Sequence, residues 1–215
     1  MRAALTVVVV LAAFVVAIHG ASGAGVPDLL KSSTRRAALK PGVVYQASLF
    51  APHVRITAPE PDWQGAQWVD HSYDWFNVSR ENGGILAVSA PSTTQSAAAT
   101  LHLLETERAD SRAVGITIRP AVPVTVGGYR GQQFDGVATG QYGHTFVPFS
   151  GHSNAASSSV GDHRKFEHGK AFRVIVLDVR GKPVVFFIDS DAPTLDLNFQ
   201  ASAAKLLKLL RFPSV

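Results

Sequence analysis

A chain of 215 residues that is 46% hydrophobic and 17% charged can form one globular domain with a sizeable core. Its formal net charge of +4 comes from scattered basic residues, with only Arg35-Arg36 and Arg164-Lys165 adjacent, which argues against a basic face for nucleic acid. The absence of cysteine excludes disulfides, thiolate metal sites and a cysteine nucleophile.

Residues 1–24 have the three-part layout of a secretory signal peptide. Arg2 supplies the positive charge, residues 3–18 are apolar apart from Thr6, and the small residues 20–24 follow. We therefore expect export of the protein and cleavage at the end of this segment. The alternative is an uncleaved N-terminal membrane anchor, but the apolar run of about 16 residues is shorter than the roughly 20 that a spanning helix needs. No later segment is long and apolar enough to span a membrane.

Residues 25–40 are polar, and we expect them to be a linker or a short helix that precedes a single domain. That domain should span residues 41–215. It should begin with two strands, at residues 43–48 and 53–58. The second of these alternates polar and apolar residues, as half-exposed strands do.

All three tryptophans, Trp63, Trp68 and Trp75, lie in one aromatic-rich segment. Part of this segment, residues 73–79, should be a strand that forms a hairpin with residues 84–89. Two interpretations of the tryptophans compete. Their rings could fill the edge of the core, as large aromatic side chains commonly do, or they could form a stacking platform that binds a sugar or another flat ligand.

The middle of the chain predicts a helix and an edge of the sheet. Helix-forming residues dominate residues 92–110. Strands at residues 114–118 and 122–126 are interrupted by prolines, which places them at an edge. Residues 124–137 predict a hairpin around Gly127-Gly128. These glycines do not predict a phosphate-binding loop, because no helix follows them.

Residues 140–170 form a long irregular stretch, and such loops in compact domains are commonly functional or disordered. The stretch contains four histidines, His144, His152, His163 and His168. Imidazole is a common zinc ligand, so two or three of these side chains could hold a metal ion. Their spacing matches no zinc motif, and the alternatives are solvated surface histidines or a pH-sensitive contact.

Two runs of β-branched and aromatic residues, 172–179 and 184–189, flank a short polar turn and predict a β-hairpin. Nearly every position in both runs is apolar, so we expect both faces to be covered and the hairpin to lie in the middle of the sheet. A last helix is expected at about residues 195–210, because its apolar residues recur at helical spacing. The residues expected to face the sheet are Phe199, Ala203, Leu206, Leu207 and Leu210, and those expected to face water are Gln200, Lys205 and Lys208.

These elements predict an α+β fold: an antiparallel β-sheet with a C-terminal amphipathic helix and a second helix packed on it. Short motifs at residues 41–45, 124–135, 176–185 and 210–212 carry a further indication. In these motifs the chain resembles a group of exported, largely uncharacterised actinobacterial proteins with a PsbP-like or LpqN-like domain. The resemblance implies a binding or accessory role outside the cytoplasm, and it transfers no catalytic residue.

We expect a non-catalytic, monomeric exported domain without a cofactor that binds a partner protein, a cell-envelope component or a small ligand. One alternative is a secreted hydrolase, for which Glu105 with Glu107 or Asp189 with Asp191 would be the paired carboxylates, although the motif Gly-x-Ser-x-Gly is absent. The other alternative is a metal-binding protein that uses the histidines of residues 140–170.

Overall fold

The structure is a computed structural model that describes residues 25–70, 73–81, 83–90, 94–109, 115–139, 142–146, 163–190 and 197–214. Residues 1–24, and with them the expected signal peptide, lie outside the described residues. In the described part of the chain, no helix has the length and apolar character needed to cross a membrane.

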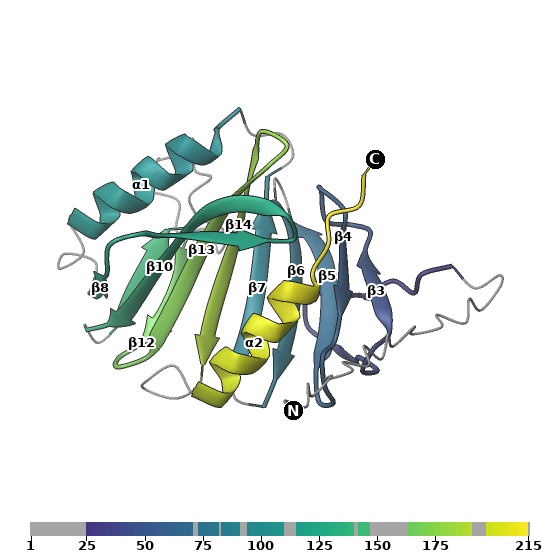
Figure 1. Ribbon diagram of the computed structural model, residues 1–215. Helices are drawn as coiled ribbons and strands as arrows, with labels where there is room; N and C mark the ends of the chain where they lie inside the picture. Colours follow the sequence, from purple (N-terminus) through teal and green to yellow (C-terminus); the bar gives the residue numbers. More distant parts are fainter. Residues whose placement is uncertain are drawn as a thin grey trace, which may run out of the picture.

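A large β-sheet forms the centre of the molecule (Figure 1). In spatial order its strands are β1 (Leu30–Lys31), β5 (Gln64–Asp70), β6 (Tyr73–Arg80), β7 (Gly83–Ser89), β14 (Lys182–Ser190), β13 (Ala171–Val179), β10 (Tyr129–Ala138) and β8 (Ile116–Ile118). Two further strands pair outside this order, β2 (Ala37–Ala38) with β5 and β9 (Val122–Val126) with β10. Every strand pair in this sheet is antiparallel except β1 with β5.

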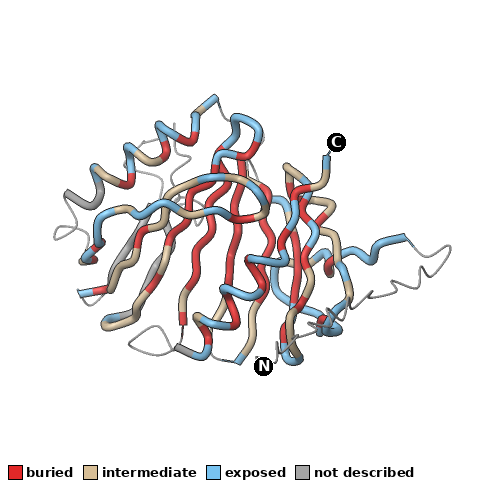
Figure 2. The backbone as a smooth tube through the Cα atoms, viewed as in Figure 1, coloured by how far each residue is buried: buried red, intermediate tan, exposed pale blue. Residues whose placement is uncertain are grey.

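The predicted central hairpin is confirmed as β13 and β14, which pair with each other and lie between β10 and β7. Val174 and Val176 are buried on one face of β13, and Ile175 and Leu177 are buried on the other. Figure 2 shows these strands buried along most of their length. Burial on both faces explains why nearly every position of the hairpin is apolar.

Two helices cover the two faces of the sheet. α1 (Ala97–Ala109) packs through Leu104 on the face that carries Phe172 and Phe187. α2 (Leu197–Leu209) lies across the opposite face, where it packs against the core that contains Phe186 and Trp63 (Figure 1). The expected α+β class is therefore confirmed in its coarse form, a largely antiparallel sheet with two helices.

Residues 25–40 differ from the expected linker, because they join the sheet. β1 and β2 both pair with β5, and the flanking Leu29 and Leu39 are buried. The buried side chain of Gln67 also holds this segment, since its amide nitrogen donates to the carbonyl of Leu29 at 3.1 Å and its oxygen accepts from the amide of Leu49 at 2.7 Å. Strands of two residues leave no periodic pattern, so the sequence did not show them.

Two small hairpins complete the fold. The predicted strands near residues 43–58 are β3 (Val44–Ala47) and β4 (Val54–Thr57), which pair with each other. The stretch expected to be irregular, residues 140–170, contains two strands instead, β11 (Tyr142–Phe146) and β12 (His163–Glu167). Their pairing corrects the expectation at both ends of the stretch, while residues 147–162 lie outside the described part.

Candidate functional site

A cleft lies between α2 and strand β9, on the face of the sheet that α2 covers. Its volume is about 180 Å³. In Figure 1, the β9–β10 hairpin passes in front of β13 and β14, and α2 lies on the same face of the sheet. The floor of the cleft comes from the sheet, and its two walls come from β9 and α2. Its lining residues are Val124, Thr125, Val126, Gln133, Arg173, Ile175, Ile188, Gln200, Ala203, Ala204, Leu207 and Lys208.

Small side chains on α2 leave room for the cleft. Ala203 and Leu207 form the lower part of this wall and are buried. Gln200, Ala204 and Lys208 form its rim, one turn apart, because residues four apart share a helix face. Because the side chain of alanine is only a methyl group, Ala203 and Ala204 leave the space beside the helix backbone open.

The opposite wall is fixed at the tip of the β9–β10 hairpin. Gly127 and Gly128 both have positive φ, 59° and 88°, as a tight two-residue turn requires. The ring of Tyr129 meets Phe212 edge to face at a centroid distance of 5.3 Å. The Tyr129 hydroxyl accepts from Arg180 Nε at 3.1 Å, and Arg180 also donates to the carbonyl of Pro213. The hairpin tip is therefore attached to the segment that follows α2.

A charged pair lies at the floor. Asp135 on β10 stands directly opposite Arg173 on β13. The guanidinium donates from Nε to Oδ1 at 2.6 Å and from Nη2 to Oδ2 at 2.9 Å, a bidentate geometry. With its amide oxygen turned toward the guanidinium, Gln133 accepts from Nε at 2.9 Å and from Nη2 at 3.1 Å. These contacts fix the orientation of Arg173 and leave its Nη1 hydrogens without a bond to any described residue.

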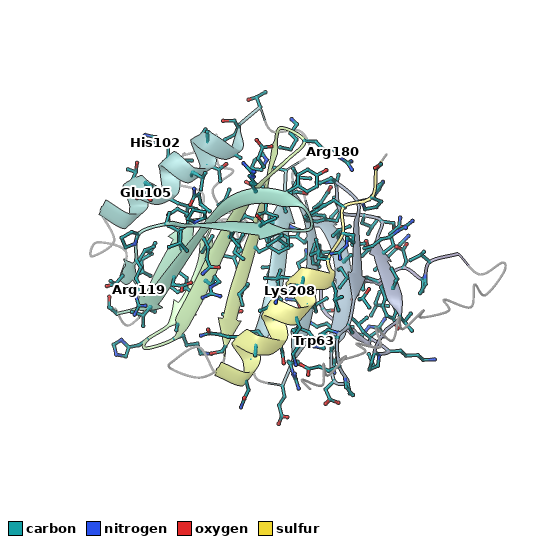
Figure 3. All side chains as sticks on the ribbon, viewed as in Figure 1. Trp63, His102, Glu105, Arg119, Arg180 and Lys208 are labelled. Carbon is teal, nitrogen blue, oxygen red and sulfur yellow. The ribbon has the colours of Figure 1, made fainter. Side chains whose placement is uncertain are left out.

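Lys208 adds a second positive charge at the rim. It stands in the last turn of α2, where a cation is favoured by the helix dipole (Figure 3). Within the described residues, no carboxylate lies within ion-pair distance of its ammonium group. The cleft therefore combines mostly apolar walls with a fixed guanidinium on the floor and a lysine on the rim.

The other edge of α2 is held tightly against β6. Arg80 Nη1 donates to Glu60 Oε1 at 2.6 Å and to Ser202 Oγ at 2.8 Å, and the Ser202 hydroxyl donates to the same carboxylate oxygen. The hydrogen bond from Ser202 and the charge of Arg80 lower the pKa of Glu60. Lys205 Nζ lies 3.8 Å from Glu60 Oε2. The hydrogen bonds among Ser202, Arg80 and Glu60 tie this edge of α2 to the end of β6.

The three tryptophans do not form the stacking platform considered from the sequence. Trp63 is fully buried beneath α2, where its ring lies 6.4 Å from that of Phe199 and 5.9 Å from the Arg80 guanidinium. Trp68 and Trp75 stack on each other, with centroids 5.8 Å apart, on the opposite face of the sheet. The alternation of side chains along β5 and β6 separates them, because neighbouring positions of a strand point to opposite faces.

The structure describes the backbone position of three of the four histidines considered as metal ligands. His144 lies in β11 and His163 in β12, where they pair with Lys165 and Phe146 respectively. His168 is exposed, and His152 lies outside the described residues. Among the side chains that the structure describes, no three His, Asp or Glu residues gather as a metal site requires.

The residues of the cleft are not those that the sequence singled out. Gln200 and Lys208 were expected to face water only, and Gln133, Asp135 and Arg173 were not considered. One signal was available: Gln133 and Asp135 occupy alternate positions of one strand, and Arg173 interrupts an apolar run. Polar residues on one face of a central strand indicate that this part of the face is incompletely covered.

Comparisons of the chain with protein-family models, with curated proteins and with solved structures found no match.

Proposed function

We propose that this protein is a binding domain that takes a small, largely apolar group into the cleft between α2 and β9. The observation that carries the proposal is the combination of apolar walls with a few fixed polar groups, which is the usual composition of ligand sites. A pocket of roughly 150 Å³ can hold a benzene-sized molecule, and this cleft is of similar size. The group that enters is thus about as large as one aryl ring or a short acyl chain.

The chemistry of the lining favours binding over hydrolysis. The residues that line the cleft in the described structure include no histidine, cysteine or carboxylate. A nucleophile such as the hydroxyl of Thr125 thus has no general base of these types beside it, and hydrolases need such a pair. The paired carboxylates named from the sequence, Glu105 with Glu107 and Asp189 with Asp191, are not among the lining residues.

We also propose that α2 is an amphipathic helix packed on the sheet. The burial of Phe199, Ala203, Leu206, Leu207 and Leu210 supports this, since one face of the helix then carries the apolar residues. We further propose that residues 1–24 direct export, because they have the sequence pattern of a signal peptide, and that the chain is related to PsbP-like or LpqN-like proteins. Both would place the binding site outside the cytoplasm.

A neutral aromatic probe tests the binding function. Benzamide is titrated into the purified protein, and backbone amide shifts are followed by NMR. We expect the largest shifts at Val124, Gln133, Ile188 and Ala204, which line the cleft.

A pair of matched variants provides the control. Ala204→Trp places an indole at the rim and should abolish the shifts, whereas Ala201→Trp makes the same change at an exposed position of α2 that does not line the cleft. Binding that survives Ala204→Trp, or shifts that map elsewhere, would overturn the proposal.

A further inference from the structure

The charges around the cleft are not balanced. Arg173 is neutralised by Asp135, with which it forms a bidentate ion pair. Lys208 on the rim has no carboxylate within ion-pair distance among the described residues. Among the residues that the structure describes, the side chains that line the cleft thus carry an excess of positive charge, which attracts an anion.

The donor groups are arranged for oxygen acceptors. Arg173 keeps about a quarter of its side-chain surface exposed, 23%, and lines the cleft. Asp135 and Gln133 hold its Nε and Nη2, so the guanidinium is fixed while its Nη1 hydrogens are left to donate. The guanidinium of arginine and the ammonium of lysine are the cationic groups that bind a carboxylate best.

From this geometry we infer that the ligand is an organic carboxylate. Its aryl or short acyl body lies between the alanines of α2 and β9, and its carboxylate receives hydrogen bonds from Arg173 and Lys208. This inference rests on the proposed function, since it uses the same cleft, and it adds the class of the ligand.

The test compares two probes of nearly equal shape, benzoate and benzamide, which differ in charge. Both are titrated into the purified protein at low salt and followed by NMR as above. Benzoate should bind more tightly than benzamide by roughly five- to ten-fold, the effect of a charge-assisted contact of about 1 to 1.4 kcal/mol. Added salt should reduce this ratio, because Lys208 is exposed.

Two substitutions should move benzoate binding in opposite directions. Lys208→Gln removes a positive charge and should weaken benzoate roughly two- to five-fold. Asp135→Asn removes the charge that neutralises Arg173, so it should strengthen benzoate by a similar factor. Benzamide should respond to neither, and a purely structural role of these residues would alter both probes in the same direction. Lys205→Gln, on the other edge of α2, is the matched control and should leave both probes unchanged.

The possible outcomes distinguish a failure of the carboxylate inference from a failure of the proposed binding function. Equal binding of both probes in the cleft, with no response to the charge variants, overturns the carboxylate inference and leaves the binding function standing. Shifts outside the cleft, no shifts at all, or binding that Ala204→Trp does not abolish, overturn both. A preference for benzoate that follows Lys208 and Asp135 in the stated directions supports both.

Discussion

The two edges of α2 differ in how they meet the rest of the protein. One edge is closed: Ser202 bonds to Arg80 and Glu60, and the neighbouring Phe199 packs on Trp63 in the core. The other edge is open, because Ala203 and Ala204 leave a cleft beside β9. The helix is therefore anchored by polar bonds on one edge and lines a cleft on the other. Stability and binding should therefore depend on different residues of the same helix.

The largest effect is expected at the apolar contact of the closed edge. Phe199→Ala should lower the free energy of unfolding by about 3–5 kcal/mol, since it leaves a cavity under the helix beside Trp63. Leu209→Ala on the exposed side of α2 is the control and should cost less than about 0.5 kcal/mol. Urea unfolding measures both, and equal losses would mean that α2 is not anchored through Phe199.

A smaller loss is expected from the polar cluster. Ser202→Ala removes the hydroxyl that bonds to Arg80 and Glu60, and it should cost about 1–2 kcal/mol in urea unfolding. Lys205→Ala removes only a mostly exposed ion pair at 3.8 Å, and its cost should stay below about 1 kcal/mol. A larger loss in Lys205→Ala than in Ser202→Ala would show that the ion pair of Lys205 with Glu60, and not the hydrogen bonds of Ser202, stabilises this edge.

The closed edge should also respond to acid. The pKa of Glu60 is lowered from its ordinary value of 4.5 by the hydrogen bond from Ser202 and by Arg80. A carboxyl with a lowered pKa stabilises the fold above its ordinary pKa, and this contribution is lost as the pH falls through the lowered value. The stability difference between the natural protein and Glu60→Gln should therefore shrink between about pH 7 and about pH 3. A difference that stays constant over this range would contradict the role of Glu60.

The smallest effect on stability is expected at the open edge. Ala204→Trp and Ala201→Trp both add an indole at an exposed position, so each should change the free energy of unfolding by less than about 0.5 kcal/mol. Only the first should alter ligand binding. Thermal unfolding and the benzamide titration, run on the same samples, would separate the two effects. A large loss of stability in Ala204→Trp alone would mean that the cleft is part of the packed core.

The sequence predicted the strongly patterned parts of the fold. The hairpin of β13 and β14 could be read from two apolar runs around a Gly-containing turn, and the hairpin of β9 and β10 from Gly127-Gly128. In both cases the signal is local, because a two-residue turn with positive φ brings neighbouring strands together.

The candidate site could not be predicted in the same way. The tryptophans drew attention because they are close in sequence, but strand alternation sends Trp63 to one face of the sheet and Trp68 and Trp75 to the other. The pairing of β11 with β12, which places His144 and His163 two register positions apart, was not foreseen from the sequence. Closeness along the chain is a poor guide to closeness in space once strands alternate.

The class of the fold and its central hairpin could be predicted from the sequence, because hydrophobic periodicity and turn chemistry act over a few residues. The place where the polar groups of the cleft meet depends on tertiary packing. Gln133, Arg173 and Lys208 come from β10, β13 and α2, and no spacing connects them. Strand register places Asp135 opposite Arg173, and the packing of α2 brings Lys208 to the rim. Contacts between such distant segments depend on the packing of the whole domain.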